Sequence, residues 1–110
     1  MINSIGWLVT KPMGLELSAL GIRSAWATHQ FGVDTKLIFV DQGVTCLTGA
    51  PGYHTTMLLE LMKQDGEVYC LRENLEEQRF SEERILPGVK VVSADDLPDL
   101  LEDLETVNSF

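Results

Sequence analysis

The sequence predicts an α/β protein, built as a single small doubly wound domain over residues 1–110, with a five-stranded, mainly parallel sheet flanked by helices. Short apolar runs alternate with segments of helical spacing, which is the order expected of strand–helix–strand crossovers in a parallel sheet. Residues 36–40 are almost continuously apolar, as in a strand that helices cover on both faces. A length of 110 residues with 45% hydrophobic residues suits one core.

The first half of the chain contains two predicted strands and two predicted helices. Residues 4–10 are mostly apolar and end at a Lys-Pro-Met-Gly turn, so they predict the first strand. Leucine, isoleucine, alanine and tryptophan recur at helical spacing through residues 15–31. Residues 34–40 predict the second strand, and a glycine-rich loop is expected over residues 41–52. Residues 53–65 predict a second helix with a glycine as its stop signal.

The second half continues the alternation with shorter elements. Residues 67–71 form a compact apolar run, and the polar residues 72–77 that follow predict a short helix. A Pro-Gly turn leads into the apolar residues 89–92, which predict the fourth strand. Ser93 is a good N-cap for a last helix, because acids follow it in the first turn and leucines recur beyond them. Residues 106–110 can supply a final short strand.

Cys70 is the residue that most directly suggests chemistry. It lies at the C-terminal end of the third predicted strand, where open α/β sheets place their ligands. Because parallel strands end at one edge, Asp41, Gly43, Val44 and Arg72 are expected to line a site around this thiol. A thiolate there would be nucleophilic. Arg72 is the only nearby cation in sequence that could lower the pKa of the thiol, and the negative charge of Glu73 opposes this effect. The alternative is a small buried core residue, which is common for free cysteine.

Other candidate residues give weaker signals. Cys46 is a possible second thiol if it reaches Cys70, and otherwise packs beneath its loop; two cysteines without a Cys-x-x-Cys pair do not predict a thioredoxin-like dithiol. His29 and His54 show no metal-ligand spacing, so no metal site is predicted. The sequence contains neither a Gly-x-Gly-x-x-Gly motif nor a Walker loop, so no nucleotide or other cofactor is predicted.

Charge and hydropathy restrict the partners and the compartment. The net charge of −9 comes from residues 56–110, which carry five basic and 14 acidic side chains. This half repels a phosphate backbone, so direct nucleic-acid binding is disfavoured, whereas a basic protein partner or a plain solvated face is compatible with it. No apolar run reaches the ~20 residues of a membrane helix, and the start lacks the basic region of a signal peptide. We therefore expect a cytoplasmic protein that does not enter a membrane, with its thiols reduced.

Several short motifs follow one another in a fixed order over nearly the whole chain. They are Lys11-Pro12-Met13-Gly14, Phe39-Val40-Asp41-Gln42-Gly43-Val44, Val68-Tyr69-Cys70, Asn74-Leu75-Glu76-Glu77, and the C-terminal Val91-Val92, Leu97, Leu100, Leu101 and Val107-Asn108-Ser109-Phe110. In this order the chain resembles the DsrE/DsrF-like sulfur-relay family, and within it the DsrF/TusC-type subunit.

The resemblance implies a flavodoxin-like sheet, a homo- or hetero-oligomer with related subunits, and sulfur donor and acceptor proteins as partners. In catalytic DsrE/TusD-type members a cysteine at the position of Cys70 carries a persulfide, whereas in DsrF/TusC-type subunits that cysteine is not dependably catalytic. Three hypotheses follow. The leading one is an intracellular sulfur-relay subunit, a possible sulfurtransferase that uses Cys70. The alternatives are a non-catalytic structural subunit of such an oligomer, and a small-ligand-binding domain that uses the loop over residues 43–52.

Overall fold

The structure, a computed structural model, describes residues 3–49 and 52–110. Its strands are β1 (Ser4–Val9), β2 (Asp34–Phe39), β3 (Glu67–Leu71), β4 (Lys90–Val92) and β5 (Thr106–Ser109). Its α-helices are α1 (Glu16–Gln30), α2 (Tyr53–Lys63), α3 (Arg72–Glu77) and α4 (Leu97–Glu102). Short 3₁₀-helices are η1 (Asp41–Leu47), η2 (Glu82–Arg84) and η3 (Ala94–Asp96).

The five strands form one sheet in the order β4-β3-β2-β1-β5, and every neighbouring pair is parallel. The chain proceeds outward from β1 to β4 and then returns to place β5 on the free side of β1. This reversal of direction next to β1 is the topological switch point of a doubly wound sheet. The predicted five-stranded α/β domain is therefore confirmed, in a flavodoxin-like arrangement whose sheet is wholly parallel.

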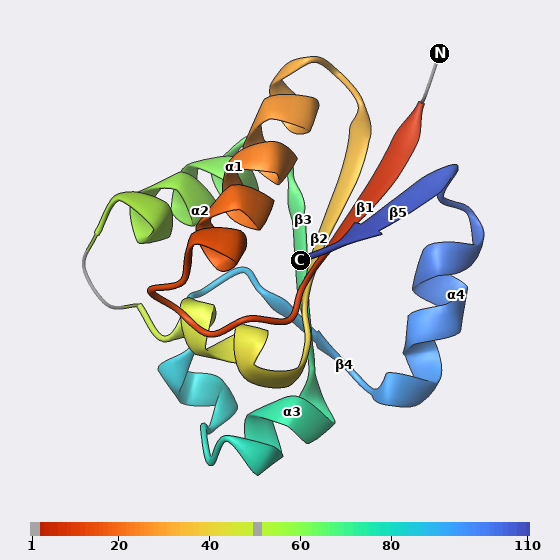
Figure 1. The fold of residues 1–110 in the computed structure, drawn as a ribbon. Coiled ribbons are helices and arrows are strands. Elements are labelled where there is room, and N and C mark those ends of the chain that lie inside the picture. Colours follow the sequence, from red (N-terminus) through yellow and green to blue (C-terminus); the bar gives the residue numbers. More distant parts are fainter. Residues whose placement is uncertain (1–2, 50–51) are drawn as a thin grey trace.

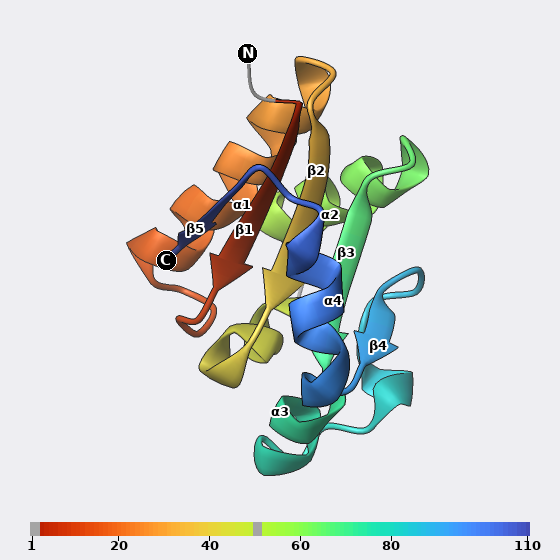
Figure 2. The ribbon, with the colours of Figure 1, turned by 90° about the vertical axis from the view of Figure 1, so that its right-hand side faces the viewer.

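Helices cover both faces of the sheet (Figure 1). α1 and α2 pack on one face, and α4 packs on the opposite face. Seen from the side, α4 lies in front of the sheet and α1 lies behind β1 and β5 (Figure 2). α3 continues directly from the C-terminal end of β3, so it lies at the edge where the strands end.

The core consists of two apolar clusters, one on each face of the sheet. β2 contributes to both, because Leu37 and Phe39 belong to the cluster under α1 and α2, and Ile38 belongs to the cluster under α4. All three side chains are completely buried. Burying a leucine, isoleucine or phenylalanine contributes about 1.5–3 kcal/mol each to folding. The continuous apolar run of this strand therefore has the physical cause that the sequence suggests.

The segment after β2 is helical rather than an open loop. The prediction of a glycine-rich loop over residues 41–52 is wrong for Asp41–Leu47, which forms η1. Val44 and Leu47 are completely buried, and their burial holds the segment against the core. Residues 50–51 of the predicted loop lie outside the described part of the chain.

The end of α2 differs in detail from the prediction. The helix ends at Lys63, two residues earlier than expected, and Asp65 takes the left-handed conformation with φ 68°. Aspartate is one of the few residues besides glycine that adopts this conformation readily. Gly66 follows and donates its N–H to the carbonyl oxygen of Leu61 at 2.8 Å. A Cβ at Gly66 would lie 2.7 Å from that same oxygen, so close backbone approach requires glycine here.

The predictions for the C-terminal segment are confirmed. Ser93 and Asp96 form a reciprocal capping box, in which the Ser93 N–H donates to Asp96 Oδ2 at 3.3 Å. The helix opens as η3 and continues as α4, whose leucines pack on the second core cluster. β5 pairs with β1 from Ile5 opposite Thr106 onward, and so forms one edge strand of the sheet.

Candidate functional site

The switch point beside β1 is filled by the chain itself. Thr10 donates both its N–H and its hydroxyl to the carbonyl oxygen of Phe110, at 2.8 and 2.6 Å. The Phe110 ring stacks on Trp7 with 5.5 Å between ring centroids, and a Cβ at Gly21 of α1 would lie 3.2 Å from it. Open α/β sheets commonly bind ligands at this point. Here an aromatic residue packs there instead.

Cys70 lies at the C-terminal end of β3, as predicted, but its side chain is completely buried. It belongs to the cluster that contains Leu75 and Leu86. Burial raises the pKa of the Cys70 thiol from its ordinary 9.0 to about 11; the negative charge of Glu82 also raises it, and Arg72 lowers it. At neutral pH the thiolate fraction is then on the order of one in a thousand or less. The described geometry holds this sulfur as a neutral thiol.

The charges near Cys70 differ from those expected from the sequence. Arg72 opens α3 and forms an exposed ion pair with Glu82, with 3.5 Å between Nε and Oε1. Glu73 was the acid expected to oppose Arg72, but its carboxylate accepts the N–H of Ala94 at 2.9 Å. This hydrogen bond is the main reason that the pKa of Glu73 is lowered. The acid that acts on the thiol is Glu82, which is ten residues beyond Arg72 in sequence and so gave no local signal.

The three residues expected to line the site from the segment after β2 have different surroundings. Asp41 is exposed at the start of η1 and has a left-handed φ of 52°. Val44 is completely buried in the core. Gly43 is buried against β1, where a Cβ would lie 2.0 Å from the carbonyl oxygen of Val9. Gly43 and Val44 therefore hold η1 in place by packing.

Cys46 is also buried, with 4% of its surface exposed. Its Sγ lies 3.9 Å from the carbonyl oxygen of Lys11, to which the thiol donates. Burial raises the pKa of Cys46 from 9.0 to about 11, and a side-chain hydrogen bond with Ser18 partly offsets the increase. This thiol is neutral at pH 7, like that of Cys70.

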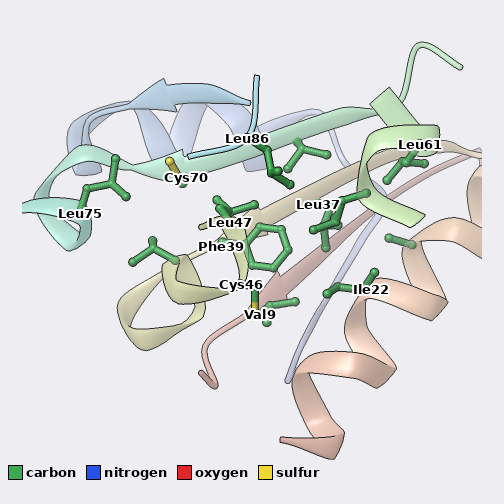
Figure 3. Packing of buried hydrophobic residues seen from close by; sticks show 14 residues of the cluster. Val9, Ile22, Leu37, Phe39, Cys46, Leu47, Leu61, Cys70, Leu75 and Leu86 are labelled. Atoms are coloured by element: carbon green, nitrogen blue, oxygen red, sulfur yellow. The ribbon is translucent and has the colours of Figure 1, made fainter. Parts of the chain in front are cut away.

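The two thiols do not form a pair. In Figure 3 Cys70 lies near Leu75 and Cys46 lies near Val9, at separate places in the cluster. Leu47 and Phe39 lie between the two sulfurs in this view. Both cysteines are free. The possibility that Cys46 resolves a bond on Cys70 has no support in this arrangement.

A cavity of about 300 Å³ lies where the start of α1 meets η1 and the start of α2. Cys46 and His54 line it, together with Ser18 and Arg23 of α1. Sequence reasoning missed this grouping, because its members come from three segments that only tertiary packing brings together. Met13, another lining residue, is 49% exposed, which only the structure reveals.

Residues 3–49 and 52–110 contain neither a metal-binding cluster nor a membrane-spanning helix. No group of three or more histidine, cysteine, aspartate or glutamate side chains is placed to hold a metal ion. No helix in this part of the chain has both the length and the apolarity to cross a membrane.

Solved structures share this fold along the whole chain. YchN from E. coli superposes with a TM-score of 0.83 at 21% sequence identity, with 100% of each chain covered. MTH1491 from Methanobacterium thermoautotrophicum, a protein of unknown function, superposes with a TM-score of 0.78 at 16% identity, over 98% of this chain and 99% of that one. No family model and no curated protein matches the sequence. At these identities the likeness concerns the fold alone, and it supports the DsrE-like fold implied by the sequence motifs.

Proposed function

We propose that this protein is an architectural subunit of a sulfur-relay assembly of DsrE/DsrF type, in the manner of the DsrF/TusC-type subunits that its sequence resembles. The observation that carries the proposal is the state of Cys70, which is completely buried with a pKa raised to about 11. Sulfur transfer needs an accessible thiolate, because the thiolate attacks the donor sulfur. A subunit in this state contributes surface and shape to an assembly rather than its own nucleophile.

A stripe of mainly apolar residues along α1 and its C-cap residue Phe31 supports the assembly part of the proposal. Leu17, Leu20 and Phe31 are 45%, 39% and 87% exposed. With Ser24 and Ala27 between them, these positions follow one another at alternating intervals of three and four residues. This is the spacing of a helix seam that packs against another helix. The stripe suits a second copy of the chain or a related subunit.

The second candidate function is the relay itself, with Cys70 as the persulfide carrier. Its position at the C-terminal end of β3 and beside Arg72 favours this role. The Cys70 thiolate would attack the terminal sulfur of a donor persulfide, and the donor's S–S bond would break. The donor would leave as a thiolate, and Cys70 would hold the transferred sulfur as a persulfide. This reaction requires the covering side chains to move aside.

Incubation with a sulfane-sulfur donor separates the two functions. For the architectural subunit we expect no added sulfur on Cys70 at pH 7.5, because a buried neutral thiol reacts slowly. Intact-mass and peptide mass spectrometry check this, with Cys46 as the second thiol in the same chain. In a reconstituted relay assembly, Cys70→Ala is expected to leave the transfer rate within about two-fold of the parent.

The contrary outcome is equally specific. One extra sulfur atom mapped to the Cys70 peptide and removed by reductant, together with loss of transfer in Cys70→Ser, would replace the architectural role by the relay role. Cys46→Ser is the matched control, since this thiol is equally buried and has a similarly raised pKa. Adducts on both thiols would count against a relay site specific to Cys70, because Cys46 lines a cavity that a small donor can enter.

Self-assembly through α1 is a separate prediction. We expect the purified protein at micromolar concentration to have the mass of an oligomer. We expect Leu20→Lys to have the mass of a monomer, because a charge within the stripe opposes burial. Light scattering after size-exclusion chromatography measures both masses. Leu59→Lys is the control, because Leu59 is exposed on α2, outside the stripe. A parent protein that is a monomer without partners would exclude self-assembly, and equal effects of both variants would exclude the stripe.

A further inference from the structure

The cavity between α1, η1 and α2 has the dimensions of a small-molecule site. Its volume of about 300 Å³ is at the lower end of the range in which proteins bind ligands. Ala19 and Ile22 of α1 form part of the wall, and Cys46 of η1 lines it from the other side. Met13 and Leu15 lie at the cavity with 49% and 48% of their surfaces exposed. A ligand with an apolar body would cover these side chains.

The polar groups around the cavity favour a negative charge. Arg23 lines it and has no carboxylate within ion-pair distance in the described part of the chain, where the ion pairs are Arg72–Glu82 and Lys90–Glu67. His54 lines it too, and its Nε2 is buried with no hydrogen-bond partner among the described residues. Buried polar atoms nearly always have a partner, so this nitrogen indicates a group that the described residues do not supply.

The N-terminal ends of two helices also favour a negative charge in the cavity. α1 and α2 both begin at the cavity, and within residues 3–49 and 52–110 neither N-cap residue, Leu15 or Gly52, forms a side-chain cap. Free N–H groups at a helix N-terminus and the helix dipole attract an anion. Glu16 also lines the cavity and acts against this attraction. One guanidinium and two helix ends oppose this one carboxylate.

We propose that this cavity binds a small organic anion, with its apolar part against Met13, Leu15 and Ile22 and its acidic group toward Arg23. The chemical class is a carboxylate or sulfonate with a short hydrocarbon body. The site is independent of sulfur transfer at Cys70, which lies elsewhere in the core (Figure 3). It also differs from a site on the loop over residues 43–52, since of that segment the cavity uses Cys46.

Titration with sodium hexanoate, followed by the backbone amide signals in NMR spectra, tests the proposal. We expect saturable shifts at Ser18, Cys46 and Thr55, and binding about 2- to 5-fold weaker for hexan-1-ol, which has the same chain without the charge. Arg23→Gln should remove the difference between the two probes. Shifts that rise linearly without saturation, or equal binding of both probes to the parent, would overturn the proposal.

Two matched variants locate the binding. Ala19→Leu fills the cavity and is expected to abolish the saturable shifts, because Ala19 lines it. Ala94→Leu makes the same change at an exposed position in η3, outside both the cavity and the α1 stripe, and should leave the affinity within two-fold of the parent. The spectra themselves report whether each variant is folded. Retained binding in a folded Ala19→Leu protein would place the ligand elsewhere and contradict the inference.

Discussion

Gly43→Ala is expected to unfold the protein partly or wholly at moderate temperature. A Cβ at this position would lie 2.0 Å from the carbonyl oxygen of Val9 and 2.8 Å from its carbonyl carbon. Backbone atoms cannot rotate away as a flexible side chain can, so η1 has to move off β1. Overpacking of this severity costs about 3 kcal/mol or more, a large part of a typical domain stability. Thermal unfolding should show a melting temperature lower by about 10–20 °C.

Gly52→Ala is the control for this substitution. No atom of the described residues lies within 4 Å of a Cβ at Gly52, and its φ of 162° is an extended conformation that alanine adopts. The same added methyl group should therefore change the free energy of unfolding by no more than about 1 kcal/mol. A Gly43→Ala protein that melts within about 2 °C of the parent would show that the close approach of η1 to β1 is wrong.

Alkaline pH is expected to destabilise the protein through its two buried thiols. Each has a pKa of about 11 when folded against an ordinary 9.0, so the unfolded chain loses these protons first. The stabilisation is complete below pH 9 and is lost as pH rises toward 11. The loss is at most about 3 kcal/mol per thiol. Tyr69 acts in the same direction, because burial and then its hydrogen bond with Glu67 raise its pKa.

Urea denaturation at pH 7.5, 9.0, 10.0 and 10.5 measures the effect. The free energy of unfolding should fall progressively above pH 9. In Cys70→Ala this fall with pH should be smaller by the contribution of one thiol, because Cys46 still contributes. The variant is expected to be less stable at every pH, because a buried sulfur is replaced by a smaller group. A parent protein with the same stability at pH 7.5 and 10.5 would contradict the raised pKa values.

Much of the fold could be predicted because it follows from local spacing of apolar residues and from capping residues. The apolar run of β2 indicates burial on both faces, and Ser93 is the N-cap that the sequence predicts, although its reciprocal bond with Asp96 was not predicted. The helical character of η1 was not predicted. The glycine in Asp41–Leu47 suggested a flexible turn, whereas Gly43 is there because β1 passes close by. Such a contact joins residues far apart in sequence, and local spacing does not reveal it.

The location of Cys70 in the sheet could be predicted from the sequence, whereas its burial could not. A strand-end cysteine before a helix places Cys70 at the correct edge of the sheet. That sulfur is buried in a cluster that includes Leu75 and Leu86, which come from later segments of the chain. The acid that acts on it, Glu82, is likewise distant in sequence. The cavity beside Cys46 likewise forms where α1, η1 and α2 meet, so no single stretch of sequence predicts it.

The pairing of β5 with β1 also affects how the chain is made. β1 spans Ser4–Val9 and its partner β5 spans Thr106–Ser109, so about a hundred residues of synthesis separate the two. A ribosome releases the chain from its N-terminus, and β1 to β4 can associate before β5 emerges. Until then the outer edge of β1 has unpaired N–H and carbonyl groups, which can pair with another nascent chain. Correct folding therefore depends on how quickly the last strand follows the rest.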